Sequence, residues 1–268
     1  MPDRPTVSLV MPCLDQARFL PRALHSVLTQ ERDFELECIV MDGGSTDGTL
    51  AILEGFGDAI RWVSGPDNGQ SDALNKGFAM AGGSIFGWLN SDDLLAPGAL
   101  RRAVDVFTSE PEVQWLYGKV KIVDEHDKVV RRPITAYKNL RMRRFSYSSL
   151  LTENWISQMG VFWRRSAYDQ VGPFRDDLQL TMDYEFWLCL AEHWPGRFVD
   201  DYLAAFRWYP TTKSGSGFEE QLREELRVAE EHAGGEYPRE ILLHRLNSAR
   251  TILVYKAMRA AARWREHE

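Results

Sequence analysis

The chain has 268 residues, 44% of them hydrophobic and 26% charged, with a net charge of −7. This length and composition are typical of a soluble globular protein with one large domain, or one domain and an appendage. The acidic balance argues against a general nucleic-acid-binding role.

Two further features bear on where the protein is found. Cys13, Cys38 and Cys189 lie far apart and show no metal-ligand spacing, which favours reduced thiols. The first residues carry no signal-peptide pattern, and no apolar run approaches the roughly 18–20 residues that span a bilayer. We therefore expect a cytoplasmic protein, with peripheral attachment at the inner face of the cell membrane left open.

The first hundred residues alternate strands with helices. The pattern predicts helices that begin near Gln16 and Thr49 and cover about 70–81. It predicts strands at 7–11, 36–41 and 60–63 and a further strand from 85. Strands and helices that alternate through short connections indicate an α/β fold with a parallel, doubly wound sheet.

Acidic residues follow two of these strands. Asp42 ends the strand at 36–41, and Asp92 and Asp93 follow the apolar run at 85–89. Ligands of open α/β sheets bind beyond the carboxyl ends of the strands, so we expect Asp42 and Asp92 to lie close together. Adjacent carboxylates repel unless a cation or hydrogen-bond donors offset their charge. This arrangement suggests a site for a divalent metal and a diphosphate.

The pattern changes after Asp93, where antiparallel character enters the sheet. The basic segment at 137–145 is interpreted as solvated surface, with contact to an anionic acceptor or lipid as the alternative. The other expected elements are helices at 97–109, 165–171 and 182–192, a strand at 115–123 in a hairpin with 129–130, and strands at 158–163 and 199–208.

From residue 218 the chain is expected to be helical, in two pieces at 218–231 and 238–264. An apolar stripe marks the second piece, formed by Leu242, Leu246, Ala249, Leu253 and Ala257. Packing of this stripe against the rest of the chain is favoured over a homodimer contact. Peripheral attachment to an anionic membrane is the third interpretation, and it predicts that truncation after about Pro238 releases the protein from membranes.

Several motifs, taken in order, resemble those of a known family. They are VMP at 10–12, MDGGSTDGT at 41–49, GPDNGQSDALNKG at 65–77 and LNSDD at 89–93, with further similarity at 158–165, 172–174 and 182–187. Over roughly residues 5–210 the chain resembles a family 2 glycosyltransferase with the GT-A fold.

The resemblance implies a Rossmann-like, mostly parallel sheet flanked by helices, with antiparallel additions and a C-terminal helical extension. A GT-A catalytic domain would cover residues 1–217, with the extension at 218–268. Within the domain, 1–96 would bind the nucleotide-sugar and 97–217 the acceptor.

The resemblance also implies roles for four acids. Asp42 would accept a hydrogen bond from the nucleotide base, typically uracil. Asp92, with Asp93 beside it, would bind the Mn2+ or Mg2+ ion that bridges the donor diphosphate. Asp183 would be the general base that takes the proton of the acceptor hydroxyl. By position alone, Asp42 could instead cap its loop and Asp183 could be a helix-end acid.

Pro12, Asp67 and Asn75 are further candidates for donor binding, although Asp67 and Asn75 could equally organise their own turn and helix. The sequence departs from the family pattern at two positions. Asn90 stands for the first acid of the metal motif, and Tyr209 stands where relatives often carry a His. If that His is a metal ligand in relatives, this protein either does without it or takes a ligand from the loop at 211–217.

The sequence thus predicts an inverting, metal-dependent glycosyltransferase in polysaccharide or cell-surface glycan synthesis. It would move a sugar from a nucleotide-diphospho-sugar, with UDP favoured, to a hydroxyl of a glycan or lipid-linked saccharide. The alternative is a non-catalytic sugar-nucleotide-binding protein on the same fold. A dinucleotide-dependent oxidoreductase is disfavoured because no GxGxxG follows the first strand.

Overall fold

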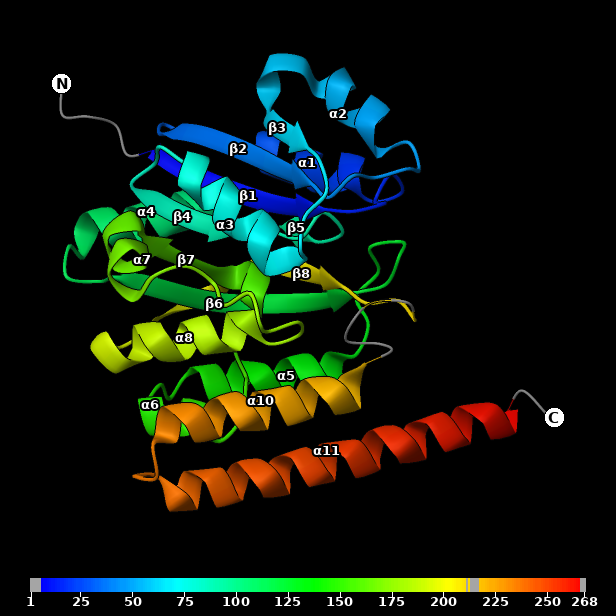
Figure 1. Ribbon diagram of the computed structural model, residues 1–268, viewed down its shortest axis with the longest axis vertical. Coiled ribbons are helices and arrows are strands. Elements are labelled where there is room, and N and C mark those ends of the chain that lie inside the picture. Colours follow the sequence, from blue (N-terminus) through cyan, green and yellow to red (C-terminus); the bar gives the residue numbers. More distant parts are fainter. Residues whose placement is uncertain (1–5, 211, 213–216, 266–268) are drawn as a thin grey trace.

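The computed structural model describes residues 6–210, 212 and 217–265 (Figure 1). Its centre is an eight-stranded sheet in the order β3-β2-β1-β4-β7-β6-β8-β5. The strands are β1 (Thr6–Cys13), β2 (Glu35–Asp42), β3 (Arg61–Ser64), β4 (Ile85–Trp88), β5 (Leu94–Leu95), β6 (Trp115–Val123), β7 (Val161–Arg164) and β8 (Arg197–Arg207).

Strand pairing divides the sheet into two halves. Strand β1 pairs in parallel with β2 and β4, and β2 pairs in parallel with β3. Strand β7 then runs antiparallel to both β4 and β6, while β8 is parallel to β6 and antiparallel to β5. The predicted fold class, a mostly parallel sheet with antiparallel additions, is confirmed.

Helices cover both faces of the sheet and extend below it. They are α1 (Leu20–Leu28), α2 (Thr49–Phe56), α3 (Gln70–Met80), α4 (Ala99–Ser109), α5 (Arg132–Met142), α6 (Tyr147–Leu151), α7 (Arg165–Val171), α8 (Met182–His193), α10 (Phe218–Ala233) and α11 (Pro238–Arg265). Short 3-10 turns lie at Gly57–Ala59 and Gln158–Gly160.

The alternation of side chains along β1 assigns these helices to two separate cores. Val7, Leu9 and Met11 pack with α1 and α4 on one face of the sheet. Val10 points to the other face, where it packs with α3 and α8. Because strand side chains alternate between faces, a buried strand with apolar residues on both faces can supply both cores.

Four local predictions differ from the structure. The first helix begins at Leu20, because Gln16 and its neighbours form a turn whose carbonyl accepts from Phe19 N and Leu20 N. The hairpin partner at 129–130 makes a single bridge, Val123 to Val129. The strand predicted at 158–163 begins at Val161, and Gln158–Gly160 form a 3-10 turn instead. Most of the segment at 137–145, predicted as solvated surface, belongs to helix α5, on which Tyr137 and Leu140 are exposed.

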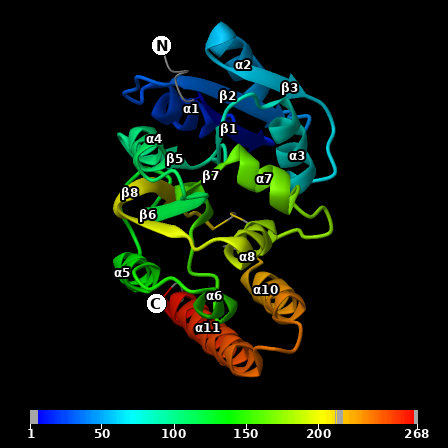
Figure 2. The same ribbon diagram turned by 90° about the vertical axis from the view of Figure 1, so that its left-hand side faces the viewer.

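Helix α10 lies beneath α8, and α11 lies beneath α10 and α6 (Figures 1 and 2). Helix α11 packs on the rest of the chain through His244, whose Nδ1 lies 2.9 Å from Leu151 O. The predicted stripe is on the other side: Leu242, Leu246 and Leu253 are 57%, 58% and 68% exposed. Among the described residues, no helix is both long enough and apolar enough to cross a membrane.

Candidate active site

Three neighbouring strands end in register at the edge where the candidate residues gather. Cys13 on β1 is level with Asp42 on β2, which is level with Ser64 on β3. Asp42 is buried, and its Oδ2 accepts hydrogen bonds from Gly44 N and Ser45 N at 3.1 Å and from Ser64 Oγ at 2.6 Å. These donors fix the carboxylate at the base of the loop that follows β2.

The turn at 65–69 lies directly against that loop. A Cβ added to Gly43 would lie 2.7 Å from Asp67 Oδ2, so only glycine permits this approach. Asp67 Oδ1 also accepts from Gly69 N at 2.9 Å, which shapes the start of α3. Pro12 is buried at the end of β1, level with Met41. Donor contacts by Asp67 and Pro12 stay predictions.

Asn75 joins α3 to the segment after α7. Its Nδ2 donates to Phe174 O at 2.8 Å, and its Oδ1 accepts from Phe174 N at 2.9 Å. Both polar ends of the amide are therefore engaged with one backbone residue. This geometry fits a role for Asn75 in organising the local structure. Donor binding by Asn75 stays a prediction.

Asn90 makes three side-chain hydrogen bonds in and around the turn that follows β4. Its Oδ1 accepts from Trp88 Nε1 and Gln70 Nε2, both at 2.8 Å, and its Nδ2 lies 3.3 Å from Asp93 Oδ2. An aspartate at this position would present a third negative charge and no donor to Asp93. The amide therefore explains how this turn holds two adjacent acids.

Asp92 and Asp93, the two acids of this turn, differ in their burial. Asp93 is fully buried, and its Oδ1 accepts from Arg207 N at 2.8 Å. Burial, followed by the charge of Asp92, holds the pKa of Asp93 well above its usual range. Metal ligation by Asp93 stays a prediction that this burial disfavours.

Asp92 is half-buried, and its Oδ2 accepts from the phenol of Tyr209 at 2.8 Å. The Tyr209 ring packs against Phe19, with 5.0 Å between ring centroids. Burial and the charge of Asp92 raise the pKa of Tyr209, so the phenol keeps its proton and remains a donor. The residue that replaces the expected His thus contacts the carboxylate predicted to bind metal.

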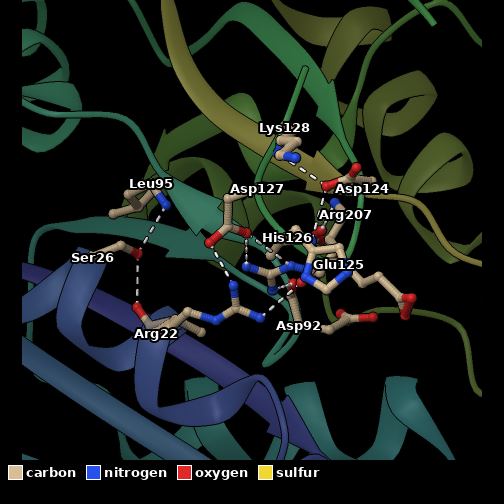
Figure 3. A network of polar contacts seen from close by, with 12 residues as sticks. Arg22, Ser26, Asp92, Leu95, Asp124, Glu125, His126, Asp127, Lys128 and Arg207 are labelled. Carbon is tan, nitrogen blue, oxygen red and sulfur yellow. Dashed lines mark hydrogen bonds and ion pairs between the residues drawn. The ribbon is translucent and has the colours of Figure 1, made fainter. Parts of the chain in front are cut away.

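A buried arginine, Arg207, contacts the same turn (Figure 3). Arg207 donates to the main-chain carbonyl of Asp92, and its Nη2 and Nε lie 2.5 and 3.2 Å from Asp127 Oδ1. Asp127 Oδ2 in turn accepts from Arg22 Nη1 at 2.6 Å. This chain of ion pairs connects α1, the loop after β6 and the turn at 90–93, and it was not predicted.

The side chains around this turn suit a hard divalent cation only in part. Asp92 offers carboxylate oxygen, the ligand type that Mn2+ and Mg2+ prefer. Most of the loop expected to replace the His, 211–217, lies outside the described residues. Within the described part of the chain, one group of three His, Cys, Asp or Glu side chains could surround a metal, and it contains neither Asp92 nor Asp93.

A cavity of about 190 Å³ connects this turn to the second half of the chain. Asn90 lines it on one side and Asp183, in the first turn of α8, on the other. Burial raises the pKa of Asp183 to about 6, although the N–H of Tyr184 and the charge of Lys138 act in the opposite direction. A carboxylate with such a pKa can accept a proton at neutral pH.

Lys138 on α5 also lines the cavity, and the sequence analysis missed its position. Burial lowers the pKa of this amine, while the charges of Glu225, Glu153 and Asp183 counteract the effect. A signal for this position exists in the sequence. Lys138 lies three residues after Thr135 and four before Met142, the two buried residues of α5, so helical spacing places all three on one face.

Glu225 on α10 is the other missed residue of the cavity. Burial and the charge of Asp183 raise its pKa to about 8. Its position could be found from periodicity, since it lies seven residues after Phe218 and three before Val228, both buried. The C-terminal extension therefore contributes a wall of this cavity.

The sequence was compared with known families and proteins. The pattern of glycosyl transferase family 2 matches residues 8–172. An uncharacterized glycosyltransferase of Mycobacterium tuberculosis is 31% identical over 195 residues, 71% of each chain. A PGL/p-HBAD biosynthesis glycosyltransferase of Mycobacterium bovis is 31% identical over 189 residues, 68% of each chain. An uncharacterized glycosyltransferase of Rickettsia conorii is 27% identical over 76% of this chain, which spans about a third (34%) of that relative.

Solved structures share the fold. S. aureus TarS 1–349 in complex with UDP-GlcNAc matches with a TM-score of 0.68 and 17% identity, over 89% of this chain and 70% of TarS 1–349. The mannosyltransferase PcManGT of Pyrobaculum calidifontis, in complex with GDP-Man and Mn2+, matches with a TM-score of 0.63 and 21% identity, over 88% of this chain and 66% of PcManGT. At these identities the likeness shows the GT-A architecture.

Proposed function

Because the chain belongs to glycosyl transferase family 2, we propose that it moves a sugar from a nucleotide-diphospho-sugar to a hydroxyl of a glycan or lipid-linked saccharide. One observation carries this proposal. A single cavity is lined both by Asn90, in the turn after β4, and by Asp183, the half-buried acid of α8. A donor bound over the turn would then place its anomeric carbon beside a carboxylate able to accept a proton.

Asp42, Pro12 and Asp67 are the proposed donor contacts at the strand ends. A carboxylate at Asp42 would accept the N3–H of uracil, and for this reason we favour UDP. Guanine also offers ring N–H donors, and the two nucleotide-bound neighbours carry different bases, so the comparison of UDP with GDP belongs to the test.

Asp92 is the proposed protein ligand of a Mn2+ or Mg2+ ion, with donor phosphate oxygens completing its coordination. Such an ion would neutralise charge on the departing nucleoside diphosphate. Asp93 and Arg207 would hold the turn in place, since both are buried beneath it. A site with so few protein charges should bind the ion poorly until the nucleotide arrives.

Asp183 is the proposed general base. It would take the proton of the acceptor hydroxyl while that oxygen attacks the anomeric carbon from the face opposite the diphosphate. One displacement of this kind inverts the anomeric centre. Lys138, across the same cavity, favours the ionised form of Asp183 through its positive charge.

Donor binding tests the nucleotide half of this proposal. Thermal unfolding of the protein should shift upward with UDP, more with UDP and Mn2+ together, and less with GDP, because a ligand that binds the folded state stabilises it. Asp42→Asn should reduce the shift with UDP. Stabilisation by GDP that exceeds stabilisation by UDP would overturn the assigned base, and tight Mn2+ binding without nucleotide would overturn the assigned metal site.

A further inference from the structure

A second cluster of metal-binding side chain types lies where α10 crosses α8. Glu185 and Cys189 lie one turn apart on α8 and therefore on the same face of the helix. His232 reaches them from the last turn of α10. Glu185 is buried and the His232 side chain is 11% exposed, so the cluster lies inside the helix pair.

The distances in this cluster match those of a tetrahedral zinc site. Cys189 Sγ lies 3.3 Å from Glu185 Oε1, and His232 Nε2 lies 3.7 Å from the same oxygen. The ligand atoms of all three residues lie within 4.8 Å of one another. Zinc bonds of about 2.0–2.3 Å place neighbouring ligand atoms of a tetrahedron roughly 3.3–3.8 Å apart. Two of the three separations therefore already have the required length.

A fourth residue orients the imidazole for this purpose. His232 Nδ1 lies 2.7 Å from Glu192 Oε1, and the phenol of Tyr147 donates to the same oxygen at 3.0 Å. In the neutral imidazole, donation from Nδ1–H to this carboxylate leaves the lone pair on Nε2, the atom that faces Glu185. Burial lowers the pKa of His232 but hydrogen bonds to Glu185 and Glu192 raise it overall, so an ion would displace the Nε2 proton wherever the imidazole is charged. Metal-binding histidines are commonly held by a carboxylate in this way.

We propose that Glu185, Cys189 and His232 bind one Zn2+ ion, with water as the fourth ligand, and that this ion joins α10 to α8. Thiolate sulfur with imidazole nitrogen selects zinc over Mg2+ or Mn2+, which prefer oxygen ligands. Binding converts the Cys189 thiol to a thiolate and releases its proton to solvent.

The position of the ion gives it a structural role. Helix α8 carries Asp183 and α10 carries Glu225, and both residues line the same cavity. An ion between these helices would hold two walls of the cavity at a fixed separation. This zinc site is separate from the nucleotide-linked metal proposed at Asp92.

Zinc binding by the full chain, purified without an affinity tag and stripped with a chelator, tests the proposal. Calorimetry with zinc chloride should show one ion per chain, and zinc should raise the unfolding temperature. Cys189→Ser should abolish tight binding, and Glu192→Gln should weaken it on the order of 10–100-fold. His193→Gln at the end of α8 and Asp92→Asn are the matched controls, and both should bind zinc as the wild type does.

Three results would overturn the zinc site. The first is that the wild type does not bind zinc. The second is that Cys189→Ser binds zinc as tightly as the wild type, and the third is that Asp92→Asn no longer binds zinc. Failure of a variant to fold is recognised from its circular dichroism, and the wild-type stoichiometry decides the question without any variant. UDP binding is measured on the same samples, so failure of the zinc site is distinguishable from failure of the proposed transferase function.

Discussion

Asp183 and Lys138 share one cavity, and their charges influence each other. Burial raises the pKa of Asp183 to about 6, and the positive charge of Lys138 limits this rise. Because the proposed base acts only when ionised, these two residues should set the acid limit of activity. Glu225 titrates higher, with a pKa raised to about 8, and therefore stays protonated across this limit.

We expect kcat/KM to decrease as the pH falls below the pKa of Asp183, which is about 6, because the carboxylate then takes up a proton. In Lys138→Gln the positive charge is lost, which raises the pKa of Asp183 further and moves the acid limb to higher pH, by roughly half a unit to one unit. The pH profile of donor turnover measures this shift. Lys121→Gln, on the exposed face of β6, is the control, and a limb that stays in place in Lys138→Gln would count against the assignment.

Tyr209 and Asp92 would together determine how the proposed metal ion is held. In Tyr209→His the phenol bond to Asp92 is lost and an imidazole is gained, so half-maximal activity should need less Mn2+, on the order of tenfold less. Tyr209→Phe removes the bond without adding a ligand and should have a smaller effect. Mn2+ titrations at saturating donor measure both, and an increased Mn2+ requirement in Tyr209→His would contradict the metal position.

Residue types and their order were enough to nominate Asp42 and Asp92, because each follows a recognisable strand. Asp183 was nominated by the family resemblance, since its position alone indicates only a helix-end acid. The sequence could not show that Asp93 turns inward to Arg207 N, since this depends on the pairing of β5 with β8. The links from Asp127 to Arg207 and from Asp127 to Arg22 join residues 80 and 105 positions apart, and no local pattern encodes such contacts.

Among the secondary structure elements, most of the longer strands could be predicted from the sequence. Largely apolar runs such as Val7–Met11 are expected to form buried strands in a chain that alternates strands with helices. Helix α5 was missed because the segment carries several basic residues and only Thr135 and Met142 are buried on it. The same bias hid Lys138, since the segment was judged by its charge and not by its helical spacing.

Helix α3 packs so closely on β1 that it requires a glycine. A Cβ on Gly77 would lie 2.4 Å from Val10 Cγ1 and 3.1 Å from Met41 Cγ. Gly77→Ala should therefore lower the free energy of unfolding by about 1–3 kcal/mol through overpacking.

Gly55→Ala is the matched control on α2. No heavy atom lies within 4 Å of its added Cβ, so the substitution should raise the free energy of unfolding by about 0.5–1 kcal/mol. Urea denaturation measures both variants. A Gly77→Ala protein as stable as the wild type would contradict the described packing of α3 against β1.

At the scale of the whole molecule, the strand-end loops and the helical layer meet at one cavity. The first half contributes Asn90 from the turn after β4, and the second contributes Asp183, Lys138 and Glu225 from three helices. Family membership covers residues 8–172, so α8 and α10 lie beyond the matched region. The proposed general base, Asp183, thus lies outside the residues that the family pattern matches.

The packing face of helix α11 was predicted wrongly from the sequence. Its leucine stripe was expected to be the packing face, yet the helix packs through His244 and leaves Leu242, Leu246 and Leu253 exposed. Periodicity identifies an apolar face but does not say which partner covers it. The homodimer and membrane interpretations of this stripe therefore stay predictions.

Donor turnover by wild type and Asp183→Asn, measured as UDP release from UDP-sugars with Mn2+ and a panel of saccharide acceptors, tests the central claim most directly. UDP affinity is measured in parallel by calorimetry. We predict turnover by the wild type, a loss of roughly 10²–10⁴-fold in Asp183→Asn, and unchanged UDP affinity. Tight UDP binding by both proteins with turnover by neither would contradict catalysis and favour a non-catalytic sugar-nucleotide-binding protein.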